Sequence, residues 1–202
     1  MNLRDKRGVD VYVALMPSGE CDLPLYPEER DRVVRETGND IVRRERYFAW
    51  RLLELGIRDS LGLELPDIGL RREGARWTSD AVDISLSHSG GALAVAISRE
   101  PVGVDIEPLD GGDAVGVAER FFNGSERELY YSAPKSERRE VFLRIWTAKE
   151  AIFKSQGGEA FSPLNTDSSG SGVYTERIHL GERNYILSVA SPCEIAVHIA
   201  EL

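Results

Sequence analysis

Two charged residues that can act together lie in the stretch FLRIWTAKEAIFKSQGG, residues 142–158. Trp146, Glu150 and Lys154 follow one another at intervals of four residues, so in a helix they share one face. A carboxylate and an ammonium one turn apart can be no more than a surface ion pair, which stabilises a helix by about 0.2–0.5 kcal/mol. At the edge of a cleft, the same two groups can hold a metal ion and a phosphate. The spacing fits both interpretations.

The choice of lysine favours the second interpretation. The chain has 25 Lys and Arg residues, of which only four are Lys, and two of these four, Lys149 and Lys154, lie in this stretch. Arginine presents a planar fork, whereas lysine presents a compact and movable point charge. A charge of that kind suits a phosphate group that shifts during a reaction.

A pair of carboxylates occurs in GVDIEPLD, residues 103–110. Alternate residues of a strand point the same way, so Asp105 and Glu107 would share a face while Val104 and Ile106 face the core. Adjacent carboxylates repel each other unless a positive charge lies between them. An alternating strand with its polar face in water also fits the pattern. With Glu150 as a third oxygen ligand, the set suits a hard cation, Mg²⁺ or Mn²⁺, that holds substrate phosphates.

A third group of polar residues, SHSGG at 87–91, joins two expected strands. Small hydroxyls, an imidazole and two glycines in a tight turn can present backbone N–H groups and His88 to an anion. The same composition is typical of a hairpin turn with a solvated histidine. A weaker indication comes from Arg44 and Arg51, which are two helical turns apart and form either a solvated face or an anion clamp.

Apolar periodicity and turn signals predict the elements that position these residues. A helix from Asn39 or Asp40 through Gly56 would carry the two arginines, and the central helix would begin at the N-cap Ser136 and stop at Gly157. The other expected elements are strands at 9–16, 82–86, 92–98, 102–106, 173–180, 184–190 and 194–200, and short helices at 27–37, 113–122 and 125–131.

Length and composition indicate a folded protein and disfavour several classes. The chain has 202 residues, of which 42% are hydrophobic and 29% are charged, and its net charge is −9. That balance disfavours a nucleic-acid-binding protein, which should show a basic surface. No apolar run approaches the roughly 18–20 residues that span a bilayer, and the N-terminus lacks a signal-peptide pattern. Cys21 and Cys193 are far apart, so we expect free thiols and a cytoplasmic location.

Five motifs together resemble a known family. In order and spacing, GVDIE, AERFFNGSE at 118–126 and WTAKEAIFK at 146–154 resemble the 4′-phosphopantetheinyl transferases of the surfactin-synthetase-activating type. SLSHS at 85–89 is similar to the upstream SHS element of that family, and RYFAWRLL at 46–53 to its N-terminal arginine helix. The resemblance covers about residues 40–165. It implies a monomeric α+β protein of two similar, pseudo-twofold-related halves, 1–100 and 101–202, each a small antiparallel sheet with a long helix.

The resemblance also implies an activity. Such an enzyme moves the 4′-phosphopantetheine arm of coenzyme A, bound between the halves, to a serine of an apo acyl, peptidyl or aryl carrier protein and releases adenosine 3′,5′-bisphosphate. Matched to the family's motifs, the magnesium ligands are Asp105, Glu107 and Glu150, and Lys154 contacts the diphosphate with Lys149 nearby. Ser87, His88 and Arg51 match residues at the 3′-phosphate, with Arg44 as a further candidate. Glu126 matches a residue that takes part in proton transfer, and Phe121 and Phe122 match the carrier-binding surface.

Some features depart from the family, and two alternatives stay open. Ser85 stands where the family often has Asn, the family's Gly-Lys-Pro element is replaced at best by Arg72 or Arg76, and the segment near residue 30 is not basic. Either Glu150 or Glu126 takes the serine proton. A magnesium-dependent hydrolase of a diphosphate, or a carrier-binding protein without activity, would share part of the pattern. The carrier and its pathway, fatty-acid or secondary metabolism, are not specified by these residues.

Overall fold

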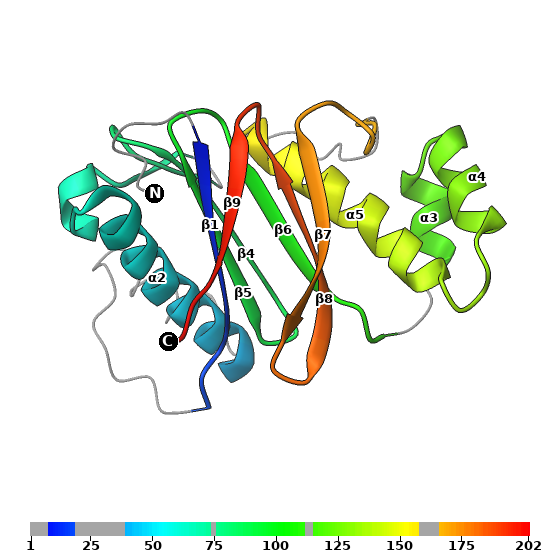
Figure 1. Ribbon diagram of the computed structural model, residues 1–202, viewed down its shortest axis with the longest axis horizontal. Helices are drawn as coiled ribbons and strands as arrows, with labels where there is room; N and C mark the ends of the chain where they lie inside the picture. Colours follow the sequence, from blue (N-terminus) through cyan, green and yellow to red (C-terminus); the bar gives the residue numbers. More distant parts are fainter. Residues whose placement is uncertain (1–7, 19–38, 74–75, 112–114, 158–165) are drawn as a thin grey trace.

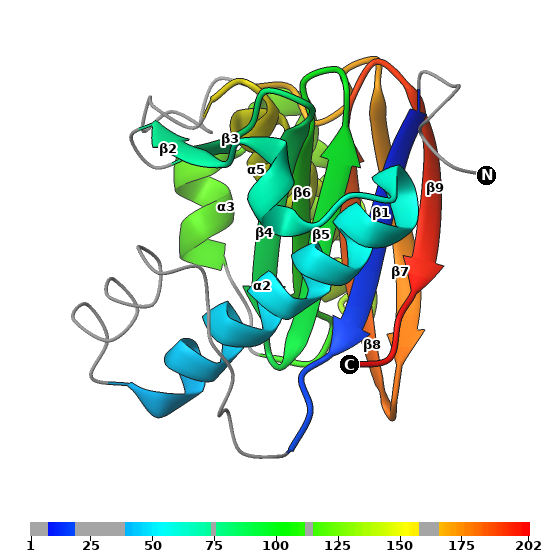
Figure 2. The same cartoon turned by 90° about the vertical axis from the view of Figure 1, so that its left-hand side faces the viewer.

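Two long helices enclose two stacked β-sheets (Figure 1). This computed structural model describes residues 8–18, 39–73, 76–111, 115–157 and 166–202. Helix α2 (Asp40–Leu61) covers the outer face of one sheet, and α5 (Arg138–Ser155) covers the outer face of the other. Figure 2 shows α2 crossing its sheet obliquely. The mixed α+β class expected from the sequence is confirmed.

The larger sheet joins the two ends of the chain. Its six strands have the order β2-β3-β4-β5-β1-β9, in which β1 (Gly8–Leu15) pairs antiparallel with β5 (Ala92–Ser98) and parallel with β9 (Glu194–Ile199). The first and last described strands lie side by side in Figure 1. The boundary expected at residue 100 therefore does not divide the chain into two separate antiparallel sheets. Pairing with β9 satisfies the backbone groups at an edge of β1 that would otherwise be open.

The smaller sheet carries the acidic pair. Its order is β6-β8-β7, all antiparallel, and comprises β6 (Gly103–Pro108), β8 (Arg183–Ala190) and β7 (Val173–Leu180). Two short helices lie beyond the start of α5 at one end of the molecule (Figure 1). The remaining elements are β2 (Arg71–Glu73), β3 (Arg76–Thr78), β4 (Asp83–Ser89), the 3-10 helix η1 (Leu65–Ile68), α3 (Val115–Phe121) and α4 (Gly124–Ser132).

Strand β5 separates two apolar cores. Leu93, Val95 and Ile97 pack in the cluster under α2. The alternate alanines of β5 pack with Val104 and Ile106 of β6 in the cluster between the sheets. Because alanine is small, the second sheet can lie close to β5 on this face. This double burial explains the apolar run at 92–97, which is too short to be anything but a buried strand or helix segment.

Both long helices have ends that differ from the sequence prediction. Helix α2 continues through Gly56 to Leu61, and Gly62, with φ of 66°, is its left-handed C-cap. A Cβ on Gly56 would lie 2.8 Å from Ile97 Cδ1, so this glycine allows the helix to approach the sheet and does not end it. Helix α5 begins at Arg138 and not after a Ser136 cap. The Pro134 carbonyl accepts hydrogen bonds from the N–H groups of residues 137 and 138, which form a turn before the helix.

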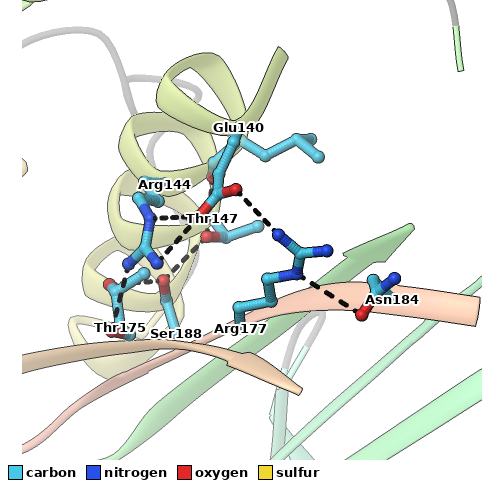
Figure 3. A network of polar contacts seen from close by, with 8 residues as sticks. Glu140, Arg144, Thr147, Thr175, Arg177, Asn184 and Ser188 are labelled. Carbon is cyan, nitrogen blue, oxygen red and sulfur yellow. Dashed lines mark hydrogen bonds and ion pairs between the residues drawn. The ribbon is translucent and has the colours of Figure 1, made fainter. Parts of the chain in front are cut away.

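A polar network holds α5 on β7 and β8 (Figure 3). Its buried part is a chain of hydroxyls: Ser188 Oγ lies 2.7 Å from Thr147 Oγ1 and 2.8 Å from Thr175 Oγ1. At its exposed end, Glu140 pairs with Arg144 and Arg177. These contacts fix the helix that carries Glu150 and Lys154 against the smaller sheet.

The seven strands expected from the sequence are all present, with ends within three residues of the prediction. Cys193 has a free thiol, whereas Cys21, the helix expected at 27–37 and the side chains of Arg72 and Arg76 lie outside what the structure describes. Within the described ranges, no helix combines the length and apolar character needed to cross a membrane.

Candidate functional site

Helix α5 and strand β6 bring Lys154 to the acidic pair. Lys154 Nζ lies 2.7 Å from Asp105 Oδ1 and donates a second hydrogen bond of 3.0 Å to the Val104 carbonyl oxygen. The Asp105 side chain is only 8% exposed, and that of Lys154 is 27% exposed. The lysine therefore pairs with a carboxylate 49 residues away and not with Glu150 on its own helix. An isolated surface pair between Glu150 and Lys154 is ruled out as its role in this structure.

Gly103 makes this contact geometrically feasible. A Cβ at this position would lie 1.9 Å from the Ala151 carbonyl oxygen and 2.6 Å from the Ser155 nitrogen, both on the α5 backbone. No side chain fits in that space, so glycine lets the last turns of α5 lie directly on the start of β6. Lys154, one turn beyond Ala151, is thereby held within reach of Asp105.

The three carboxylates predicted as metal ligands lie in a partly desolvated, electronegative environment. Burial raises the pKa of Glu107, and the charge of Asp105 raises it further against the hydrogen bond from Ser89. Burial, followed by the charge of Asp105, also raises the pKa of Glu150, and Lys154 opposes this shift. Among the described residues, Asp105 Oδ2 is buried without a hydrogen-bond partner. These features are expected of partly buried carboxylates that lie near one another and whose repulsion Lys154 offsets only in part.

The acidic residues are not gathered into a ready-made metal cage. In the part of the chain that the structure describes, no three His, Cys, Asp or Glu side chains form a group able to hold a metal ion. Oxygens of Asp105 and Glu107 are instead bonded to Lys154, Ser87 and Ser89.

The Ser-His-Ser element is part of a strand and not of a turn. Its three residues pair with Ala92–Ala94 of β5, and the turn consists of Gly90 and Gly91, with φ of 57° and 84°. Because strand residues alternate, Ser87 and His88 point to opposite faces. Ser87 Oγ donates to Asp105 Oδ1 at 2.8 Å, so the structure places Ser87 at the carboxylates and not beside His88.

His88 is anchored by a residue that the sequence analysis did not single out. Its Nδ1 lies 3.1 Å from Oε2 of Glu45 on α2, a residue that is 8% exposed. Burial lowers the pKa of His88, whereas the neighbouring Glu45 acts to raise it. The position of Glu45 in the sequence could have indicated this role. It falls one turn before the apolar residue Phe48 on the buried face of α2, where a carboxylate is unusual.

The two arginines of α2 do not share a partner. Arg44 Nη2 donates to the Pro17 carbonyl oxygen at 2.6 Å, and its guanidinium lies 5.9 Å from the Phe48 ring centroid. Arg51 forms an ion pair with Glu54. A joint anion clamp is therefore not formed in this structure, although the Arg51 side chain is 37% exposed.

Lys149 and Glu126 form a separate, buried ion pair. Lys149 is 0% exposed, lies 2.8 Å from Glu126 Oε2 and donates to the Thr166 carbonyl oxygen at 2.5 Å. Glu126 also accepts N–H groups from Asn123 and Ser168, at 2.8 and 2.9 Å. The first is half of a capping box at the start of α4, which the sequence NGSE could have indicated. The structure thus brings neither residue to the acidic pair.

The two phenylalanines expected on the carrier-binding surface lie in different environments. Phe122 is 4% exposed and packs with Tyr130 and Phe142, so its assignment to the surface was wrong. Phe121 is half-buried and contacts the Trp146 ring edge-on, with ring centroids 5.7 Å apart. Phe121 is the last residue of α3, whereas Phe122 follows the helix and packs in the core, so only Phe121 is left partly accessible.

Sequence comparisons identify the class of protein to which this fold and site belong. Residues 101–190, from β6 to β8, match the 4′-phosphopantetheinyl transferase superfamily. The 4′-phosphopantetheinyl transferase AcpT of Escherichia coli strain K12 is 33% identical over 140 residues, which cover 67% of this chain and 70% of AcpT. The chain belongs to the 4′-phosphopantetheinyl transferase superfamily.

Relatives from Bacillus subtilis agree with the type that the motifs indicated. The 4′-phosphopantetheinyl transferase ffp is 36% identical over 84 residues, 42% of this chain and 37% of ffp. The 4′-phosphopantetheinyl transferase Sfp of strain 168 is 31% identical over 87 residues, 42% of this chain and 37% of Sfp. These two alignments therefore span little more than a third of each relative, and the predicted resemblance to the Sfp type is confirmed.

Proposed function

We propose that this chain transfers the 4′-phosphopantetheine arm of coenzyme A to a serine of an apo carrier protein and releases adenosine 3′,5′-bisphosphate. The observation that carries the proposal is the Lys154–Asp105 contact beside two further carboxylates whose pKa values are raised. Membership of the superfamily supports the choice of coenzyme A and a carrier protein as substrates.

Asp105, Glu107 and Glu150 would hold Mg²⁺, or Mn²⁺ in its place. The unpartnered Asp105 Oδ2 and the all-carboxylate donor set support a hard cation, because such a cation would relieve the repulsion among these groups. When bound, the cation would supply positive charge to the diphosphate oxygens. Lys154, the movable point charge of the site, would contribute a further charge to the diphosphate as that group moves through the reaction.

The transfer step requires an acceptor for one proton. The carrier serine oxygen forms a bond to the phosphorus next to pantetheine, the bond from that phosphorus to the bridging oxygen breaks, and the nucleotide leaves as adenosine 3′,5′-bisphosphate. We assign the serine proton to Glu150, since among the described residues its carboxylate has no hydrogen-bond or ion-pair partner and its pKa is raised. Glu126, bonded to Lys149 and to two backbone N–H groups, is less available.

The nucleotide would extend towards α2. His88 and Arg51 are the candidates to contact its 3′-phosphate, with Arg44 next, and coenzyme A would lie between the half that carries His88 and the half that carries Asp105. A pseudo-twofold relation of the two halves, a monomeric state and a cytoplasmic location complete the proposal, with no role for nucleic acid or a membrane.

The test is mass spectrometry of a panel of apo carrier proteins incubated with this protein, coenzyme A and Mg²⁺. We expect one or more carriers to gain a single phosphopantetheine, and the matched carrier with Ala in place of the acceptor serine to gain none. Nucleotide release without a carrier would favour a hydrolase. Neither release nor modification across the panel would favour a binding protein without activity.

A further inference from the structure

We propose that Ser87 and Ser89 are positioning residues that orient the Asp105 and Glu107 carboxylates for a divalent cation. Of the Ser-His-Ser element, only His88 would then face the nucleotide. This inference rests on the proposed function, because it concerns how the same site holds its metal.

The basis is a row of side chains that connects β4 to β6 across the seam between the two sheets. Strand β6 is an edge strand of the smaller sheet, so alternate N–H groups on its outer side have no strand partner. Side chains of β4 accept hydrogen bonds from two of them and from the N–H group of Val102, the residue just before the strand. The three bonds are Val102 N to Asp83 Oδ2 at 2.7 Å, Val104 N to Ser85 Oγ at 3.0 Å and Ile106 N to Ser87 Oγ at 3.4 Å.

The bond from Ile106 fixes where the Ser87 hydroxyl proton points. A serine hydroxyl has one proton to donate, and an ionised carboxylate can only accept. The Ile106 N–H donates to Ser87 Oγ, so the proton is directed to Asp105 Oδ1, 2.8 Å away. Lys154 occupies the same oxygen, which leaves Asp105 Oδ2 as the oxygen without a described partner. Ser87 therefore sets which oxygen of Asp105 is available to a cation.

Ser89 has the same relation to the second carboxylate. Its Oγ donates to Glu107 Oε2 at 2.7 Å. The turn that follows is held by the smaller sheet, because the Gly90 carbonyl oxygen accepts from Arg183 Nη1 at 2.8 Å and from the Tyr185 hydroxyl at 3.1 Å. Ser89 is thus held by its own bond to Glu107 on β6 and by the bonds of the next residue, Gly90, to β8.

His88 belongs to the opposite face. It is bonded to Glu45 of α2, and the Gly91 N–H donates to the other oxygen of Glu45 at 3.4 Å. The alternation of β4 therefore divides the element between two tasks, with both serines on the carboxylates and the histidine towards α2.

The experiment measures Mn²⁺ affinity directly, by titration followed by electron paramagnetic resonance, in the absence of coenzyme A. Loss of a residue that orients a metal ligand typically weakens metal binding 10–100-fold, so we expect Ser87→Ala and Ser89→Ala to weaken Mn²⁺ binding by about 10-fold or more. Ser85→Ala is the matched control, because Ser85 occupies the same row but its described bond is to a backbone N–H group. Its Mn²⁺ affinity should match the wild type. Ser87→Thr, which keeps the hydroxyl, should restore most of the affinity and covers the case in which Ser87→Ala does not fold.

A second measurement separates the two faces of β4. The preference for coenzyme A over dephospho-coenzyme A should be retained in both serine variants and reduced in His88→Ala. Wild-type Mn²⁺ affinity in Ser87→Ala and Ser89→Ala, with a reduced nucleotide preference, would overturn the inference while leaving the transferase proposal intact. If no carrier is modified by the wild type but the serine variants still lose Mn²⁺, the positioning role stands and the transferase proposal fails.

Discussion

Replacing Gly103 with alanine should separate α5 from β6 and disable the site. The added Cβ would lie 1.9 Å from the Ala151 carbonyl oxygen, whereas ordinary contact begins at about 3.4 Å. Because the opposing atoms are helix backbone, they cannot rotate away, and the end of α5 would have to move by about 1.5 Å. That movement carries Lys154 and Glu150 away from Asp105.

The size of each effect follows from this displacement and from general values for overpacking and for misplaced reacting groups. Overpacking of this kind costs about 1–3 kcal/mol, which for a chain of 202 residues lowers the melting temperature by roughly 2–12 °C. A displacement of about 1 Å among reacting groups can lower turnover about 10²-fold. We expect both changes in Gly103→Ala, measured by thermal unfolding and by the rate of carrier modification.

The control is Gly116→Ala. In α3, a Cβ on Gly116 would meet no heavy atom within 4 Å, so this variant should be neutral or more stable by up to about 1 kcal/mol, with wild-type turnover. A Gly103→Ala protein with wild-type melting temperature and turnover would refute the argument that close packing of α5 on β6 positions the site.

Three further outcomes follow from the charged groups. Lys154→Ala should lower turnover about 10²-fold or more and lower the free energy of unfolding by about 1.5–3 kcal/mol, since it removes a charged hydrogen bond to buried Asp105. Lys154→Arg should recover only part of the lost turnover. Full activity in the alanine variant would show that the lysine is not part of the site. Because the pKa of Glu107 is raised in the folded state, the free energy of unfolding without metal should fall as pH rises above the ordinary glutamate pKa. Glu107→Gln should flatten this fall and should no longer be stabilised by Mg²⁺. An unchanged pH profile in the variant would contradict the placement of Glu107 in a partly buried acidic site. Glu126→Gln or Lys149→Met alone should lower the free energy of unfolding, measured with denaturant, by about 3–5 kcal/mol, because each single change leaves a buried charge unpaired. The double variant should lose much less. Single variants with near-wild-type stability would show that the pair does not anchor the structure.

Part of the candidate site could be predicted because its geometry is local. Alternation along one strand placed Asp105 and Glu107 together, with Val104 and Ile106 in the core, and this pattern depends only on residues two positions apart. The motif spacing likewise indicated the family, which the comparisons confirmed.

Local pattern was misleading where distant segments meet. Glu150 and Lys154 have the spacing of a helical ion pair, yet the packing of α5 on β6 places the lysine in an ion pair with Asp105. Consecutive residues Ser87 and His88 suggested one shared task, but strand alternation sends them to opposite faces. Gly56 suggested a helix end, whereas the helix continues because the sheet needs room there.

By itself, the sequence determined the order and approximate bounds of most elements, the α+β class and the acidic strand, because periodicity and turn chemistry act over a few residues. The tertiary structure alone decided that β9 pairs with β1, that Glu45 anchors His88, and that Lys149 is buried against Glu126. Each of these contacts joins residues 23 to 186 positions apart, and which groups meet at that distance is set by the packing of whole helices and sheets.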